Sequence, residues 1–546
     1  MRAIATAILF ASGFAFGGCS SATPDDSDLT LVVTSPERGT SSPGGTVTVT
    51  GRVTEASSVT INGTTVAPAT DGSFTATVTV GIGLGIVETI ATGPGGTQIR
   101  DVRAVLSGNV VPSDGALAAP LAASAGVEAL RGIGTAIGNS AEGLDYTNLV
   151  KAFNPIYQND GCLGATVNVT SVAVGNIGVA LVPRQGSLET DVEISNIVVR
   201  AHANYKFSCI GGSTDITVNV AKARIGGDLG VALTGGRLDA SLPNVSIALD
   251  GFNFDIGGVP GAVENLLRDK VREGITNALQ NVIRDRVPPI AEQTIAGLLA
   301  KPFTTEVLGH DLSVTVNPTA AEVSPEGLFV AIESSLTVEG GEGGMYVATP
   351  QGVTPATLDG VRGLGVAVAD DAVNQLFAGV WATNVLDRTL PIEATGPLAA
   401  ILDDDATTIE IHLMLPPSVT TGAEALRLSV GDLIVTTRDP AGQEVQRIAI
   451  SLHSPISAEP SQSGKILLTL GTPEVKAQIL TQTDVVQRPL TDEAVEGIIG
   501  AVWNLVGTQA SDALGKLPLP AVGGINLGAP EITAKDGFLV ADMQLN

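Results

Sequence analysis

Strict alternation between apolar residues and polar or small residues recurs through the middle of the chain. Three segments show it, with Val, Ile or Leu at every second position: 216–220, 229–233 and 245–249. Successive side chains of a β-strand point to opposite faces, so each segment predicts a strand with one apolar face. A sheet of such strands has one dry side that another apolar surface must cover.

An amphipathic helix directly after these strands offers that cover. Val263, Leu267, Val271, Ile275 and Leu279 recur at the spacing of one helical face. The sequence 287–289 (Val-Pro-Pro) then predicts an interruption, because proline removes a backbone hydrogen bond. Periodicity alone favours a normally packed α+β core. The alternative is an elongated apolar space, which the low aromatic content of 3% would leave poorly filled.

The same layout occurs twice after residue 120. The first unit opens with a Gly- and Ala-rich helical stretch around residues 127–144 and continues with strands up to residue 256. The second predicts strands (307–349), a helix (370–387), strands (408–486), a helix (492–514) and a last strand pair. Asp370 or Asp371 is the expected cap of the first of these two helices.

The N-terminus has the features of an export signal. A short apolar run over residues 3–16 follows Arg2 and ends in Gly17-Gly18-Cys19. This ending resembles a bacterial lipoprotein signal, which implies removal of residues 1–18 and lipidation of Cys19. The alternative is an ordinary secretion signal with an incidental cysteine. By the sorting pattern that this resemblance implies, Ser20 after the cysteine favours delivery to the outer membrane. We therefore expect an outer-membrane lipoprotein of the bacterial cell envelope, facing the periplasm or the surface.

Residues 19–28 are polar and acidic and predict a tether. Export also bears on Cys162 and Cys209, because disulfides persist outside the cytoplasm. We expect these two residues to form a disulfide, worth about 4 kcal/mol in the chain-entropy view. Two free buried thiols are the alternative.

Residues 29–107 predict a small all-β sandwich. Short alternating strands are separated by turn signals, of which Asn62-Gly63 is the strongest for a hairpin. The segment resembles a bacterial immunoglobulin-like module. Residues 108–120, rich in Gly, Pro and Ala, are expected to be a linker.

Four short stretches, in order along the chain, carry a second resemblance. They are Gly143-Leu144-Asp145-Tyr146, Val182-Pro183 with residues 188–199, residues 364–381, and residues 514–539. Together they resemble the superfamily of bactericidal/permeability-increasing protein and lipopolysaccharide-binding protein, whose members have a tubular lipid-binding fold. The family's characteristic disulfide has a different spacing, so a 162–209 bridge is analogous at best.

This resemblance implies the fold class that we expect. It is an α+β chain with two tandem tubular lipid-binding barrels, each a curved antiparallel sheet around long helices, preceded by the immunoglobulin-like sandwich. The first barrel would span residues 121–302 and the second 303–546.

Charge separates this chain from the host-defence members of that superfamily. The net charge is −27, which argues against nucleic-acid binding and against capture of phosphate-rich head groups. The densest basic cluster is Arg268, Lys270 and Arg272, and Asp269 and Glu273 offset it. Burial of a lipid tail depends on apolar area and stays compatible with an acidic chain.

The sequence holds no recognisable catalytic motif. His202, His310, His412 and His453 are scattered without metal-ligand spacing, and no nucleophile elbow or nucleotide loop occurs. We expect no enzyme activity, no catalytic residue, no metal and no cofactor.

The predicted function is to bind, and in a stronger form to transfer, a lipid or other hydrophobic small molecule, with the N-terminal lipid as membrane anchor. Protein partners stay undefined. The alternatives are an adhesive or structural surface lipoprotein with solid barrels, and an enzyme of unrecognised type. The apolar residues expected to line the first cavity or its helix seal are Val192, Ile194, Ile216, Val218, Val220, Leu229, Val231, Leu233, Val245, Ile247, Leu249, Leu267 and Val271.

Overall fold

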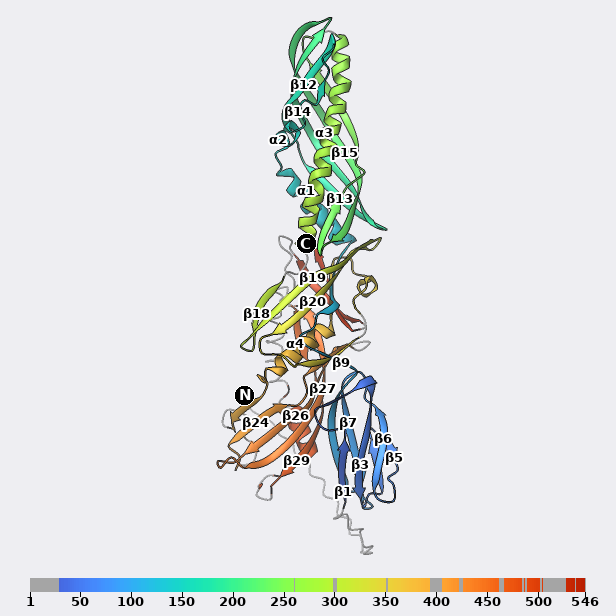
Figure 1. Ribbon diagram of the computed structural model, residues 1–546, viewed down its shortest axis with the longest axis vertical. Helices are drawn as coiled ribbons and strands as arrows, with labels where there is room; N and C mark the ends of the chain where they lie inside the picture. The colour runs from blue at the N-terminus through green and yellow to red at the C-terminus, as the bar shows by residue number, and fades with distance from the viewer. Residues whose placement is uncertain are drawn as a thin grey trace, which may run out of the picture. The chain divides into compact units, whose positions relative to one another are not determined.

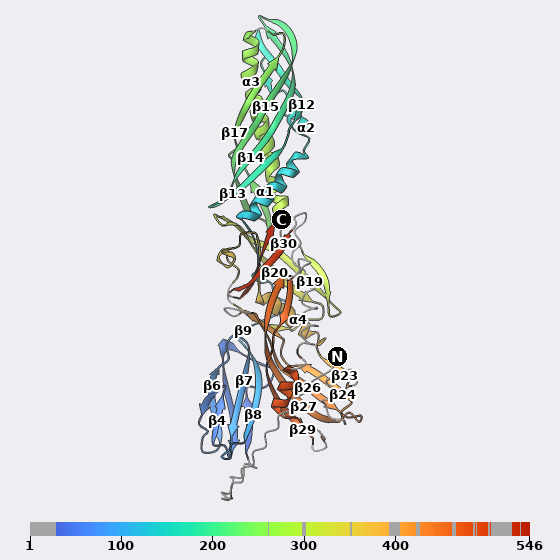
Figure 2. The same ribbon diagram turned by 180° about the vertical axis from the view of Figure 1, so that it is seen from behind.

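The computed structural model describes residues 29–259, 261–297, 302–349, 352–392, 405–421, 426–460, 466–483, 486, 489–500, 503, 527–535 and 537–545 (Figures 1 and 2). Contacts divide the chain into two compact units. The first unit consists of the described residues up to Glu37 together with Val47–Val78 and Val87–Val102. The second unit consists of Arg38–Thr46, Thr79–Ile86 and the described residues from Arg103 onwards. Cys19 and the expected signal and tether lie outside the described residues.

The strands between residues 29 and 107 form two sheets and confirm the predicted β-sandwich. One sheet has the order β1 (Thr30–Ser35), β3 (Thr46–Thr54), β6 (Ser73–Thr79). The other has the order β2 (Thr40–Ser42), β8 (Gln98–Ser107), β7 (Gly83–Thr92), β4 (Ser58–Ile61), β5 (Thr64–Val66), and a 3-10 turn η2 (Pro43–Gly45) follows β2. Asn62 and Gly63, both at positive φ, form the turn between β4 and β5, as the Asn-Gly signal predicts.

The alternating segments belong to an antiparallel sheet that curves into an open half-barrel (Figure 1). Its order is β11-β12-β14-β15-β16, with β13 paired to β14 and β17 paired to β15. Ile216, Val218 and Val220 are buried along β15, while the residues between them are exposed or half-buried. The strands are β11 (Tyr157–Gln158), β12 (Leu163–Ala173), β13 (Ile177–Arg184), β14 (Ser187–Phe207), β15 (Ile210–Thr234), β16 (Arg237–Ser241) and β17 (Ser246–Ile256).

Three helices accompany this sheet: α1 (Val127–Glu142), α2 (Tyr146–Lys151) and α3 (Gly261–Ala296). Figures 1 and 2 show α3 running along the strands. The predicted interruption at Val287-Pro288-Pro289 is wrong, because α3 continues through both prolines. Val287, Ala291 and Ile295 prolong its buried stripe into the core, and this packing offsets the lost backbone hydrogen bonds. Among the described residues, no helix has both the length and the apolar composition needed to cross a membrane.

A second sheet, called here the central sheet, joins distant parts of the chain. Its order is β18 (Phe303–Val307), β19 (His310–Ser324), β20 (Gly327–Val338), β10 (Leu117–Gly126), β22 (Leu364–Ala369), β31 (Phe538–Leu545), β30 (Leu527–Lys535). A two-stranded ladder pairs β9 (Asn109–Pro112) with β21 (Met345–Ala348), and a 3-10 turn η3 (Pro355–Leu358) precedes β22.

A third sheet, called here the C-terminal sheet, has the order β23-β24-β26-β27-β28, with β25 paired to β26 and β29 paired to β27. Helix α4 (Asp370–Ala382) packs against both the central and the C-terminal sheet. Residues 492–500 are helical, and the rest of the expected helix 492–514, apart from Trp503, lies outside the described residues. The strands are β23 (Arg388–Pro391), β24 (Thr408–Leu413), β25 (Ser418–Thr421), β26 (Leu426–Arg438), β27 (Glu444–Pro460), β28 (Ile466–Leu470) and β29 (Glu474–Gln482).

The expected fold class, an α+β chain with two tandem tubular barrels that each wrap a curved antiparallel sheet around long helices, is wrong. Strand predominates over helix in the described residues, and the sheets stay open as half-barrels whose edge strands do not pair with each other. Beyond residue 302, the helices in the described part of the chain are short: α4 has 13 residues, and residues 492–500 are helical. The apolar strand faces there pack against another sheet and against α4. Packing of one sheet on another buries one face of each strand. It therefore accounts for the same alternation of apolar and polar residues that the expected fold explained by a long helix.

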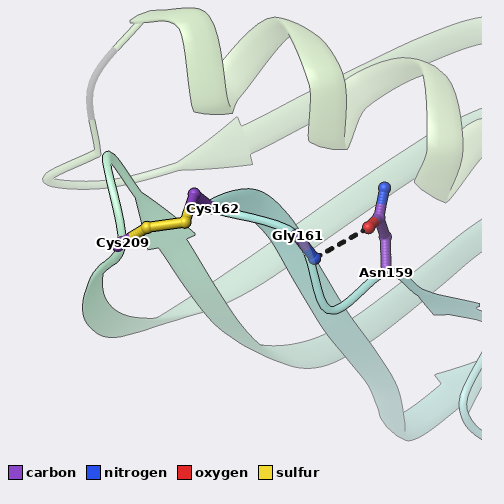
Figure 3. Close-up of a disulfide and its surroundings, with 4 residues drawn as sticks. All are labelled: Asn159, Gly161, Cys162 and Cys209. Carbon is purple, nitrogen blue, oxygen red and sulfur yellow. Dashed lines mark hydrogen bonds between the residues drawn. A yellow bond between two sulfur atoms is a disulfide. The ribbon is translucent and has the colours of Figure 1, made fainter.

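The predicted disulfide between Cys162 and Cys209 is confirmed (Figure 3). It ties the residue before β12 to the tight turn that joins β14 to β15, where Ser208 and Cys209 both have positive φ. The backbone N–H of Cys209 also donates to the carbonyl oxygen of Cys162 at 3.2 Å. The neighbouring loop is ordered by the Gly161 N–H, which donates to Oδ1 of Asn159 at 3.0 Å.

Candidate functional site

The apolar residues expected to line a cavity lie close together in the half-barrel. With two exceptions they belong to one buried cluster, which also contains the apolar stripes of α1 and α3. Ile247 packs against this cluster half-buried, and Leu233 is half-buried near the end of β15. The cluster members are Val192, Ile194, Ile216, Val218, Val220, Leu229, Val231, Val245, Leu249, Leu267 and Val271. Their role in lining a ligand stays a prediction.

Helix α4 combines apolar and polar groups in an unusual way. It begins with two aspartates and places Asp370, Asp371, Asn374 and Gln375 on one stripe, because residues three to four apart are neighbours on a helix. All four side chains are buried, each at most 7% exposed. Buried polar groups destabilise a fold unless they find hydrogen-bond partners, so these partners define the local structure.

The two amides join α4 to both sheets. Asn374 pairs with the backbone of Val419 in β25: its Nδ2 donates to the carbonyl at 2.8 Å, and its Oδ1 accepts from the N–H at 2.6 Å. Oε1 of Gln375 accepts from the N–H of Leu336 in β20 at 3.0 Å, and its Nε2 donates to the carbonyl of Gly115 at 2.5 Å. These bonds hold the helix in a fixed position between the sheets.

The two aspartates each accept hydrogen bonds from a different threonine, Thr349 or Thr421. Both carboxylate oxygens of Asp371 accept from the N–H of Thr349 at 3.0 Å, and its Oδ2 also accepts from the Thr349 hydroxyl at 3.1 Å. Burial raises the pKa of Asp371 to about 6; the neighbouring Asp370 adds to this rise, whereas the Thr349 hydrogen bonds oppose it.

Asp370 is only partly satisfied. Its Oδ2 accepts from the N–H of Thr421 at 3.1 Å and from the Thr421 hydroxyl at 2.9 Å. Its Oδ1 is buried and has no hydrogen-bond partner in the described part of the chain. Burial raises the pKa of Asp370, against the lowering effect of the Thr421 hydrogen bonds. A buried polar atom without a partner calls for an explanation, and an unfilled ligand site is one.

Beside Asp370 lies a cavity of about 60 Å³. Its walls come from β22 and β31 of the central sheet, from α4, and from β25, β26 and β27 of the C-terminal sheet. Of the described residues that line it, Asp370 is the one polar residue; the others include Val373, Phe377, Leu428 and Leu539. Apolar cavities stay dry and accept apolar molecules, so an apolar group would suit this space.

Sequence reasoning did not find this site. The expected role of Asp370 or Asp371 as the helix cap is wrong, because the cap position is Ala369 and no side chain caps the helix there. The available signal was the pattern Asp-Asp-x-x-Asn-Gln within an otherwise apolar segment. Such a pattern indicates polar groups that must be satisfied inside the protein, because apolar neighbours leave no solvent-facing side.

Comparisons with known proteins match separate parts of the chain. Residues 29–107 match the family described as glucodextranase, domain B. Comparison with curated protein sequences finds no match.

Among solved structures, the crystal structure of a lipopolysaccharide binding protein is similar at 14% identity, covering 79% of this chain and 99% of that chain with a TM-score of 0.48. The solution structure of latherin is similar at 14% identity over 32% of this chain and 88% of that chain, with a TM-score of 0.21. Fibronectin(III)-like modules of CbhA from Clostridium thermocellum share 13% identity over 34% of this chain and 92% of that chain, with a TM-score of 0.13.

Proposed function

We propose that this chain binds a hydrophobic small molecule, such as a lipid, without catalysing a reaction. The observation that carries this proposal is the apolar cavity beside Asp370, at the place where α4 meets both sheets. Ligand sites are typically apolar spaces with a small number of polar groups that orient the ligand. Among the described residues, the lining of this cavity is apolar apart from Asp370.

We further propose that binding takes place at the bacterial outer membrane, with a lipid on Cys19 as the anchor. The charged start, the short apolar run and the Gly-Gly-Cys ending of residues 1–19 support this location. The apolar cluster of the half-barrel is a second place where a hydrocarbon tail would fit, if its helices and sheet separate.

Mass spectrometry of an organic extract of the purified chain tests the proposal. We expect a reproducible apolar molecule in the extract of the wild-type protein. Val373→Trp fills the α4 cavity and should remove that molecule, whereas Val373→Leu is the matched control that keeps most of the space. Circular dichroism checks that both variants keep their strand content.

A second pair of variants tests the half-barrel. Val231 is buried in β15, and the adjacent Ala232 is exposed on the opposite face. Loss of the ligand in Val231→Trp, but not in Ala232→Trp, would place it in the half-barrel. An extract of folded wild-type protein that contains no apolar molecule, together with no uptake of added lipid, would refute the proposed function.

A further inference from the structure

The apolar face of the half-barrel ends in three exposed side chains. Along β14 this face runs from Ala203, which is buried, through Tyr205, which is half-buried, to Phe207, which is 37% exposed. Phe207 lies directly opposite Leu163 of β12 and Ile210 of β15, which are 49% and 75% exposed. Leu163, Phe207 and Ile210, called here the tip patch, therefore continue the apolar face of the sheet beyond the end of its buried core.

The disulfide restrains two members of the tip patch. Cys162 directly precedes Leu163, and Cys209 directly precedes Ile210. The cross-link joins the residue before β12 to the turn between β14 and β15 (Figure 3). Because the segments that carry the patch are held together before any partner arrives, they lose little conformational entropy when the patch is covered.

The charge around the tip patch differs from that of the whole chain. The net charge of the chain is −27, yet residues 161–168 and 203–214 contain one charged residue, Lys206, and no acidic residue. Asp160 and Asp215 stand just outside these two segments. An apolar patch with a lysine beside it suits a layer of lipid head groups, because the phosphates attract a cation and would repel carboxylates.

The size of the tip patch favours a lipid surface over a protein as its partner. A stable protein interface takes about 20–30 residues from each side, whereas the patch consists of three side chains around one turn. Hydrocarbon has no fixed shape, so a small apolar patch can enter it without a complementary surface. Apolar side chains of membrane-surface segments enter the boundary between head groups and acyl chains in this way.

We propose that the tip patch inserts into the surface of a lipid membrane, with Lys206 close to the lipid phosphates. This inference goes beyond the proposed function, because it requires neither the α4 cavity nor a lipid on Cys19. Three partly exposed side chains bury much less apolar area than acyl chains do. The contact is therefore reversible and holds the end of the half-barrel at the membrane without replacing the proposed anchor.

Tryptophan fluorescence of the purified full chain tests this contact. Ile210→Trp places an indole in the tip patch, and Asn219→Trp is the matched control at an exposed position of the same strand. Each variant is mixed with phosphatidylcholine vesicles whose acyl chains carry bromine, which quenches an indole that reaches the hydrocarbon. We expect stronger quenching in Ile210→Trp than in Asn219→Trp, and we expect it to persist in high salt because apolar insertion is not screened.

A second substitution shows whether the neighbouring side chain takes part. Leu163→Asp, added to the Ile210→Trp chain, places a carboxylate in the patch. The ratio of inserted to free tip, obtained from the quenching, should fall at least about tenfold. Phe207→Trp is the second reporter if circular dichroism shows that Ile210→Trp folds poorly.

Three results would each overturn the proposal. Equal quenching of Ile210→Trp and Asn219→Trp would show that the patch does not reach hydrocarbon. Quenching that requires phosphatidylglycerol vesicles and disappears in high salt would assign the contact to the charge of Lys206 alone. A wild-type dimer that Ile210→Ser dissociates in analytical ultracentrifugation would show that a second copy covers the patch. None of these results affects the extraction test of ligand binding, so the two proposals fail separately.

Discussion

Asp370, Asp371 and Asp432 are buried carboxylates whose partners differ in kind. Thr421 and Thr349 donate hydrogen bonds to Asp370 and Asp371. Asp432 instead forms an ion pair with Nη1 of Arg38 at 2.7 Å and accepts a hydrogen bond from the N–H of Ala104 at 3.2 Å. Asp432 has a positive φ of 46° at an irregularity in the pairing of β26 with β27. Removing one partner of a buried ion pair leaves an uncompensated charge, so the pair of Arg38 and Asp432 contributes to stability. Oδ1 of Asp370, in contrast, has no hydrogen-bond partner among the residues that the structure describes.

Asp371 makes stability depend on pH in a predictable direction. Burial raises its pKa from 3.8 to about 6 in the folded chain, so the folded state binds the proton more tightly than the unfolded state does. The contribution of protonated Asp371 to the free energy of unfolding is therefore complete below the pKa that Asp371 has in the unfolded chain. This contribution is lost as the pH rises through about 6. Asp371→Asn removes this titration. The stability advantage of the wild type over this variant should shrink by about 2–3 kcal/mol between about pH 4 and pH 7.

Denaturant unfolding followed by tryptophan fluorescence measures this difference, because Trp381 lies in α4 itself. The matched control is Asp71→Asn. Asp71 is exposed, and hydrogen bonds from Ser73 lower its pKa, so it titrates below this pH range. A stability difference between wild type and Asp371→Asn that stays constant across the range would contradict the prediction.

At the scale of elements, α1 and β13 approach each other more closely than side chains allow. A Cβ atom at Gly134 would lie 2.5 Å from the carbonyl oxygen of Val179, and one at Gly138 would lie 2.6 Å from that of Ile177. The glycines that weaken the helical signal in the sequence are therefore required for packing. A helix of lower intrinsic propensity is stabilised here by its tertiary contacts.

Gly134→Ala should destabilise this contact despite the better helix propensity of alanine. The added methyl group meets backbone, which cannot rotate away, and overpacking of this kind costs about 1–3 kcal/mol. Hydrogen exchange of peptides covering α1 and β13 should show faster exchange in the variant. Gly261→Ala is the control, since a Cβ there meets nothing within 4 Å. Equal protection in wild type and Gly134→Ala would show that the contact adjusts freely.

Local patterns predicted many elements, and long-range packing explains most errors. The alternation around Ile216 and Val218 and the Asn62-Gly63 turn depend on neighbouring residues, so the strands and the hairpin follow from the sequence. How the apolar strand faces are covered depends on residues far along the chain. For that reason the prediction of two tubular barrels around long helices is wrong, and the sequence did not predict the position of β10 between β20 and β22. The Asp370 site was missed for the same reason, because Thr421 and Leu428 reach it through tertiary contacts.

For the whole molecule, charge and the proposed anchor act in opposite directions at a membrane. A net charge of −27 repels the anionic lipids of a bacterial membrane. Electrostatic attraction therefore does not favour attachment of the chain to such a membrane. In the proposed arrangement, the lipid on Cys19 supplies the free energy of membrane binding. Each buried methylene of an acyl chain contributes about 0.8 kcal/mol, and more than one chain gives stable attachment.

Cys19→Ser should therefore move the protein from the membrane fraction to the soluble fraction, with the fold of residues 29–546 unchanged. Fractionation and immunoblotting measure the shift, and Ser20→Ala is the control that keeps the cysteine. Raising the salt concentration should not release the wild-type protein, because acyl-chain insertion does not depend on the attraction between charges that salt screens. If Cys19→Ser stays with the membrane through a high-salt wash, lipidation is not the anchor, and an apolar surface of the folded chain must hold it there.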